Sequence, residues 1–129
     1  MNKTADISEL KKTAVEFLQL VVAGRIDEAY RQYVDMSGKH HNAYFTAGFP
    51  ALRRGMEENH LQFPDKHILP KHVLVDGDFV AVHSHVVLRA REKEIAVVHL
   101  FRFHNGKIVE LWDCGQPIPV DCPNADGVF

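Results

Sequence analysis

Alternating apolar and polar residues dominate the second half of the chain, and short turn sequences interrupt them. The segment 95–117 contains one β-rich run before the Asn-Gly pair at 105–106 and another after it. Asn-Gly between alternating apolar residues is the strongest short-range signal for a β-hairpin. An Asp-Gly pair at 76–77 joins two further β-rich runs, 66–75 and 79–88. The pattern therefore predicts two consecutive hairpins of antiparallel strands.

The first part of the chain has a helical period instead. Residues 6–23 place apolar side chains on one stripe, with Asp6 and Glu9 suited to cap the first turn and Gly24 suited to end the helix. The stripe consists of Ile7, Leu10, Ala14, Phe17, Leu18, Val21 and Val22. The spacing predicts one long amphipathic helix that packs its apolar side on the rest of the fold.

Two shorter helices are expected at 27–33 and at 50–61, with a break in regular structure at 36–38 between them. Helices followed by consecutive antiparallel strands predict an α+β fold. A chain of 129 residues is large enough for one domain with its own core, so we expect a single domain over 1–129. Its last part, 117–129, has three prolines and no periodic pattern, which predicts an irregular tail.

The turn of the central hairpin decides which side chains share a face. A two-residue loop would put His104 opposite Lys107 and leave His99 and Asp113 on opposite faces. A type I turn with a bulge at the glycine would put Phe103 opposite Lys107 and bring His99 and Asp113 onto one face. We favour this second register because it leaves one face almost wholly apolar.

In the favoured register, Arg102 and Glu110 share the other face and can pair diagonally across the strands. His99 and Asp113 are then polar exceptions on the apolar face, and polar groups on such a face require a reason. The apolar face consists of Val97, His99, Phe101, Phe103, Val109, Leu111 and Asp113, and the other face of Val98, Leu100, Arg102, Ile108, Glu110 and Trp112.

This hairpin resembles a known family. The runs VHLFRF at 98–103, GKIVE at 106–110 and WD at 112–113 resemble the SnoaL-like family of the NTF2-like superfamily, and the segments 115–117 and 121–129 resemble a bacterial branch of it. The resemblance covers nearly the whole chain. It implies a cystatin-like cone, in which N-terminal helices pack on a curved antiparallel sheet that encloses a pocket. Relatives include polyketide cyclases, ketosteroid isomerases, scytalone dehydratase and limonene epoxide hydrolase, so one scaffold carries several reactions.

The resemblance also implies a catalytic pair. In SnoaL-like cyclases an aspartate on the last strand is the acid/base group and a histidine on the preceding strand is its neighbour; Asp113 and His99 match these positions. Many family members carry an aspartate where this chain has His99. Burial in an apolar cone disfavours the charged form of Asp113, whereas a protonated histidine nearby would favour it. Such a pair can move protons at a carbon next to a carbonyl. The alternative is a buried pair that only specifies the fold.

Other candidate site residues depend on the resemblance or on the register. The motif VAVH at 80–83 recurs in the resembling branch and favours the strand face with His83 as the face that lines the cone. His41 and Asn42 match a His-Asn pair near the pocket rim, although both also suit a solvated turn. Phe101 and Trp112 are candidate ligand contacts. For Trp112, packing on the outer sheet face or against a partner chain is the alternative.

Composition limits the partners. A net charge of −2 gives no electrostatic basis for binding nucleic acid or anionic membranes, and no apolar run has membrane-spanning length. Cys114 and Cys122 are too few for a disulfide framework, and the N-terminus lacks the apolar core of a signal peptide, so we expect free thiols and a cytoplasmic protein.

His83, His85 and His99 come from two strands without a local metal motif, so we expect no metal and no cofactor.

Two functions follow as expectations. The first is a small cofactor-free enzyme of the isomerase, cyclase or lyase type, acting on an apolar carbonyl compound with Asp113, His99 and His83. The alternative is a non-catalytic domain that binds a small apolar ligand or dimerises. In either case we expect a homodimer through the outer sheet face, because Val98, Leu100, Ile108 and Trp112 would otherwise form a large exposed apolar patch.

Overall fold

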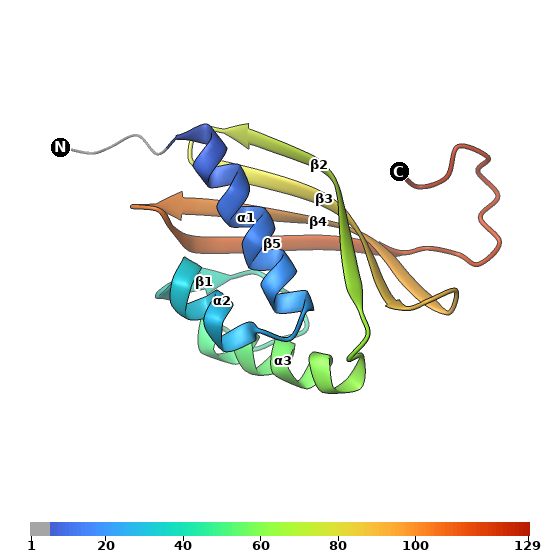
Figure 1. Cartoon of the computed structure of the whole chain (residues 1–129), viewed down its shortest axis with the longest axis horizontal. Helices are drawn as coiled ribbons and strands as arrows, with labels where there is room; N and C mark the ends of the chain where they lie inside the picture. Colours follow the sequence, from blue (N-terminus) through green and yellow to red (C-terminus); the bar gives the residue numbers. More distant parts are fainter. Residues whose placement is uncertain (1–5) are drawn as a thin grey trace.

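The computed structural model describes residues 6–129, which form three helices and one five-stranded sheet (Figure 1). The order of elements is α1 (Ile7–Val22), α2 (Ile26–Tyr33), β1 (Val34–His40), α3 (Phe49–Gln62), β2 (His67–Asp76), β3 (Phe79–Arg89), β4 (Lys93–His104) and β5 (Lys107–Pro117). The predicted α+β class and its cone of helices on a curved sheet are confirmed. No helix in the described part of the chain is long and apolar enough to cross a membrane.

The helices begin and end where their sequence signals predict. The Asp6 side chain accepts a hydrogen bond from the Ser8 backbone N–H at 3.0 Å and so caps α1. Gly24 has φ +87°, a conformation that favours glycine, and the chain turns there into α2. Pro50 lies in the first turn of α3, where its missing N–H costs nothing.

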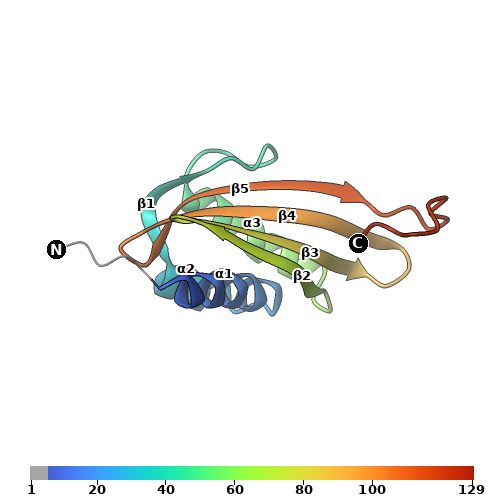
Figure 2. The same cartoon turned by 90° about the horizontal axis from the view of Figure 1, so that it is seen from above.

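The strands lie in the order β1-β5-β4-β3-β2, and three of the four pairings are antiparallel. Seen from above in Figure 2, α1 and α2 lie on one side of the sheet, which we call the inner face; the opposite side is the outer face. The C-terminal segment beyond Pro117 has no helix or strand and lies at the end of the sheet reached by β5 (Figure 1).

The predicted break at 36–38 is wrong. These residues lie within β1, which pairs in parallel with β5 and carries a register shift between Val34 and Lys39. The strand has a polar sequence because it lies at the edge of the sheet, where only one neighbour is present. Gly38 lies directly against the Val109 carbonyl, and any side chain at this position would collide with it.

The predicted turn of the central hairpin is also wrong, although its consequence holds. Asn105 and Gly106 form a two-residue loop with φ of 51° and 75°, as in a type I′ turn, and His104 pairs with Lys107. The extra residue is Val109 in β5, so that Phe103 pairs with Ile108 while Arg102 pairs with Glu110.

The bulge at Val109 sets the faces of β5. It places Ile108 on the inner face, where the residue is fully buried, instead of on the outer face as predicted. It also restores the alternation that brings His99 opposite Asp113. The core lies between the helices and this face, where the Phe17 ring of α1 meets the Phe101 ring edge-on at 5.8 Å between centroids.

Candidate active site

His99 on β4 and Asp113 on β5 are cross-strand partners on the inner face of the sheet. Directly opposite residues of antiparallel strands have Cβ atoms about 5 Å apart, so the two side chains lie next to each other. The neighbouring pair toward the turn is Phe101 with Leu111, both buried in the core. The two polar side chains are therefore placed at the border of the apolar core, on the face covered by the helices.

The Asp113 carboxylate is held by Asn42. Its Oδ2 accepts a hydrogen bond from the Asn42 side-chain Nδ2 at 2.9 Å. Within residues 6–129, no hydrogen bond joins the Asp113 and His99 side chains, although the two residues are paired on the sheet. The group that orients the Asp113 carboxylate is therefore the asparagine of the predicted His-Asn pair, and not the neighbouring His99.

His99 is kept neutral by its surroundings. Burial lowers the pKa of His99 from 6.5 to about 4, and the charge of Asp113 opposes part of this shift. Its ring lies nearly parallel to that of Phe101, at 6.2 Å between centroids and 19° between planes. Among the described residues its buried Nδ1 has no hydrogen-bond partner. A neutral imidazole with an unpaired buried nitrogen can donate to, or accept from, a polar atom of a ligand.

Tyr30 is a residue of this region that sequence reasoning missed. It lies on α2, is buried, and contacts the rings of Phe17 and Phe49 edge-on. Burial raises the pKa of the Tyr30 hydroxyl; the Arg53 charge opposes this and the Asp113 charge adds to it. Tyr30 is therefore a neutral hydroxyl within electrostatic reach of Asp113. Its only signal in the sequence is an apolar-face position on a short helix, which is equally typical of core packing.

His83 does not lie with His99 and Asp113, so the prediction that its strand face lines the cone is wrong. Val82 pairs with His99, which puts the alternate residues of β3 on the outer face. There the His83 Nδ1 lies 3.0 Å from the His72 Nδ1 on β2. The two rings are within 6° of parallel at 5.3 Å between centroids, so one nitrogen donates and the other accepts across the strands. The residues of β3 that face the core are the alternate ones, Val80, Val82 and Ser84, and all three are buried.

His41 and Trp112 also lie on the outer face. Their rings are stacked at 4.9 Å between centroids and 13° between planes, and the His41 Nε2–H donates to the Glu110 Oε2 at 2.6 Å. Trp112 thus packs on the outer face, as the favoured register predicts. Phe101 is completely buried between His99 and Phe17 and forms part of the core.

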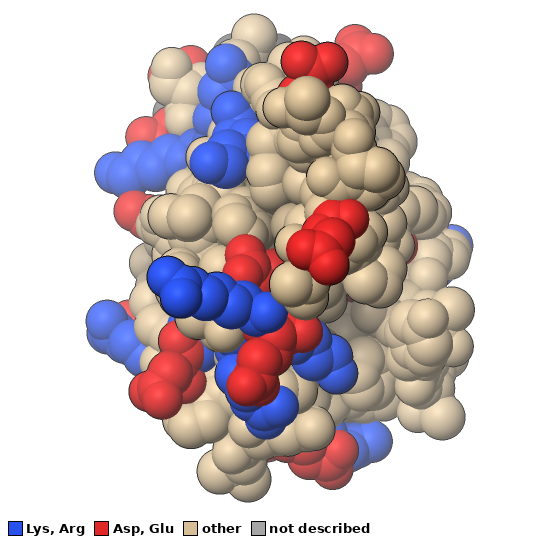
Figure 3. Space-filling model, turned by 90° about the vertical axis from the view of Figure 1, so that its right-hand side faces the viewer, with Lys and Arg blue, Asp and Glu red and all other residues tan. Residues whose placement is uncertain are grey.

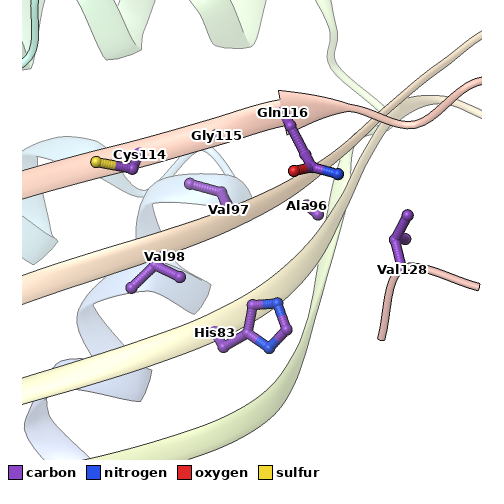
Figure 4. Close-up of a pocket in the computed structure, with 8 residues that line it drawn as sticks. All are labelled: His83, Ala96, Val97, Val98, Cys114, Gly115, Gln116 and Val128. Carbon is purple, nitrogen blue, oxygen red and sulfur yellow. The ribbon is translucent and has the colours of Figure 1, made fainter.

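A hollow of about 310 Å³ lies on the outer face, where β3, β4 and β5 approach the C-terminal segment. Figure 4 shows His83 and Cys114 on either side of Val98, with Val128 of the C-terminal segment across the hollow. Neither His99 nor Asp113 lines this hollow or the two others, one between α1 and α2 and one beside the β3–β4 turn.

The described residues contain no group of three or more His, Cys, Asp or Glu side chains arranged to hold a metal ion. Two further histidines form hydrogen bonds within the fold. His85 Nε2 donates to Glu94 Oε1 at 2.6 Å, and His40 Nε2 donates to the Thr46 carbonyl at 2.8 Å. Cys114 and Cys122 are free thiols. The candidate site described above consists of Asp113, His99, Asn42 and Tyr30, whose side chains can transfer protons or form hydrogen bonds.

Solved structures share this architecture at low sequence identity. A candidate polyketide cyclase from Bacillus cereus has a TM-score of 0.73 and 20% identity, covering 84% of this chain and 75% of that one. A cystatin-fold protein from Novosphingobium aromaticivorans has a TM-score of 0.70 and 19% identity, covering 84% and 99%. AclR from Streptomyces galilaeus, a candidate hydroxylase, has a TM-score of 0.69 and 22% identity, covering 86% and 91%. These likenesses show the fold.

Sequence comparison gives the family. No curated protein sequence matches this chain. The sequence profile of the SnoaL-like domain matches residues 14–111, from the middle of α1 to the inner-face residue Leu111 of β5. This span is well over half of the chain and contains Asn42 and His99, while Asp113 lies just beyond it. The chain therefore belongs to the SnoaL-like domain family, with the cystatin-like fold of its structural neighbours.

Proposed function

We propose that this protein is a cofactor-free enzyme that moves protons on an apolar carbonyl compound, with Asp113 as the general base and acid. The observation that carries the proposal is the pairing of Asp113 with His99 on the inner face, where Asn42 holds the carboxylate. A carboxylate and a neutral imidazole side by side in an apolar cone are the groups that proton transfer next to a carbonyl requires.

Each group has a separate role in this reaction. Asp113 takes a proton from the carbon next to the carbonyl, and the electron pair of the C–H bond moves into an enolate. The neutral His99 imidazole donates its N–H to the enolate oxygen as charge develops there, since a hydrogen bond strengthens when its acceptor becomes ionised. Asp113 then returns the proton to another carbon, or to the opposite face of the same carbon, which completes an isomerisation; in a cyclisation or elimination the electron pair of the enolate would instead form the new carbon–carbon bond or expel a leaving group.

The family supports a small-molecule reaction of the cyclase or isomerase type. Solved structures with this fold carry different names, a candidate polyketide cyclase in one case and a candidate hydroxylase in another. The scaffold alone therefore does not choose the reaction, and the proposal rests on the residues at the site. A small apolar ligand is supported by the apolar neighbours of His99, which include the buried Phe101 ring.

The proposal is tested by deuterium exchange. A panel of small apolar ketones is incubated with the protein in D₂O, and loss of the proton signal next to each carbonyl is followed by NMR. We expect at least one ketone to exchange faster with the protein than with buffer or heat-inactivated protein. Exchange at the background rate for every ketone that binds would overturn the proposal.

A non-catalytic ligand-binding domain is the second candidate. One observation favours it: neither Asp113 nor His99 lines any of the three hollows described above. In this case ketones or other apolar molecules would bind without exchange, and the same experiment separates the two functions. Saturable chemical-shift changes with no gain in exchange rate would establish the binding domain.

We also propose a homodimer through the outer face. Figure 3 views the sheet from its end, with the outer face edge-on at the right; few Lys, Arg, Asp or Glu side chains are visible on that side, whereas they gather on the left of the view. Apolar side chains on this face are open to solvent, with Val98 38% exposed and Leu74 67% exposed. An apolar face of this kind on a small protein is typical of a protein interface.

The dimer gives a prediction in solution. Val98→Glu places a charge at the centre of the outer face and should shift the mass measured by light scattering from two chains to one. Val120→Glu is the matched control, because Val120 is 80% exposed on the C-terminal segment and lies outside the sheet. A wild-type mass of one chain at all concentrations would contradict the dimer.

A further inference from the structure

The segment between β1 and α3 contacts both faces of β5 with two consecutive residues. His41 lies on the outer face, where its Nε2–H donates to Glu110 Oε2 at 2.6 Å. Asn42 lies on the inner face, where its Nδ2 donates to Asp113 Oδ2 at 2.9 Å. Glu110 and Asp113 project from opposite sides of the same strand, so this segment spans the edge of β5.

The edge of β5 is accessible at this point because β1 ends. His40 pairs with Leu111 as the last residue of β1, and the His41 backbone N–H still donates to the Leu111 carbonyl at 2.8 Å. Beyond this bond the chain leaves the sheet. The position of Asn42 therefore depends on what holds His41, because no further strand pairing follows.

His41 is held firmly on the outer face. Its ring stacks on Trp112, and its acceptor Glu110 is in turn fixed by Arg102, whose Nε and Nη2 both lie 3.0 Å from Glu110 Oε1. The His41 hydrogen bond, followed by the Arg102 interactions, lowers the pKa of Glu110 against the opposing effect of burial. Glu110 is thus an ionised acceptor at neutral pH, and a hydrogen bond to an ionised group is stronger than a neutral one.

Asn42 can present only its amide nitrogen to Asp113. Its Oδ1 accepts the Tyr44 backbone N–H at 2.9 Å, and its own backbone N–H donates to His40 Nδ1 at 3.1 Å. The oxygen is therefore committed within the segment, and the Nδ2 group points to the carboxylate. This orientation requires the segment to stay where His41 anchors it.

We infer that His41 is a positioning residue: by binding Glu110 and Trp112 on the outer face, it holds Asn42 in place to orient the Asp113 carboxylate on the inner face. The inference rests on the proposed function for its effect on turnover, since Asp113 is the base there. Its structural part, the dependence of the Asn42–Asp113 hydrogen bond on His41, can be measured without any substrate.

The test compares two substitutions of His41. His41→Phe keeps a ring to stack on Trp112 but removes the N–H that Glu110 accepts, whereas the amide N–H of His41→Gln can still donate to Glu110. The readout is the Asn42 carboxamide signal in ¹⁵N NMR spectra, assigned by its loss in Asn42→Ala. We expect the Phe variant to move this signal toward that of a free amide and the Gln variant to restore much of its position. His104→Phe, an exposed site on β4, is the matched control and should leave the signal unchanged.

Turnover provides the second readout. Since small misplacements of catalytic groups are costly, His41→Phe should lower kcat for ketone exchange on the order of 10-fold with little change in KM. Glu110→Ala, which removes the acceptor of the His41 N–H, should have the same effect if His41→Phe does not fold. An Asn42 signal that stays at its wild-type position in folded His41→Phe would overturn the inference. If Asp113→Asn retains full exchange, the proposed base is wrong, and the NMR result still decides the role of His41.

Discussion

Asp113→Asn is expected to lower the rate of ketone exchange by about two to four orders of magnitude, the usual contribution of a positioned acid/base group. The amide has the shape of the carboxylate, so the fold and ligand binding should remain. It cannot take a proton from carbon, although its Oδ1 can still accept the hydrogen bond from the Asn42 Nδ2. The measurement is kcat for exchange, with KM and thermal unfolding recorded for the same preparations.

The control for this prediction is Asp121→Asn. It makes the same chemical change at an exposed carboxylate on the C-terminal segment and should leave exchange unchanged. Asn42→Ala should give an intermediate loss, because it leaves the base in place without its orienting hydrogen bond. Full exchange activity in Asp113→Asn would remove Asp113 from the mechanism.

The second large effect is a loss of stability in acid caused by His99. Its folded-state pKa of about 4 lies below its ordinary value of 6.5, so the unfolded chain binds a proton that the folded chain does not. The stabilisation is fully present above pH 6.5 and is lost as pH falls from 6.5 toward 4. Over this range the free energy of unfolding should decrease by roughly 3 kcal/mol through this one group.

Urea unfolding between pH 7 and pH 4 measures this effect. His99→Gln removes the titrating ring, so its free energy of unfolding should fall less steeply over the same range. His104→Gln, which changes an exposed histidine on the same strand, should follow the wild type. Parallel pH curves for the wild type and His99→Gln would show that His99 is not buried in its neutral form.

Elements with strong local signals were predictable from the sequence. The apolar stripe of α1 and its Asp6 cap predicted a helix that ends one residue from the observed bound. Both hairpin turns lie at the predicted Asp-Gly and Asn-Gly pairs. These features depend on residues close together in the chain, and their physical causes can therefore be read from a short window.

Features that depend on a distant partner were not predictable. β1 has a polar sequence with a glycine, and it is a strand only because β5 supplies its hydrogen bonds and Gly38 allows the close approach to Val109. The bulge is at Val109 instead of at the turn, where Asn105-Gly106 alone satisfies the two-residue loop. The predicted break at 36–38 and the predicted bulge at the turn are both wrong where β1 pairs with β5, because these two segments are far apart in the sequence.

The candidate site was predictable in part for the same reason. The pairing of His99 with Asp113 follows from the hairpin and is present, whereas the face of β3 depends on a separate register. The greater apolar content of Val80 and Val82 indicated the buried face correctly, and the family motif that favoured His83 did not. Asn42 was identified as a site residue by the resemblance, but its hydrogen bond to Asp113 required the path of the segment after β1.

The central claim is that a carbonyl ligand meets Asp113 and His99 on the inner face. The most direct measurement is a titration of isotope-labelled protein with an apolar ketone that exchanges or binds, followed by NMR of the side chains and backbone. The account predicts the largest saturable shifts at His99, Asp113 and the Asn42 carboxamide. Shifts confined to His83 and Cys114, around the outer hollow, would contradict it.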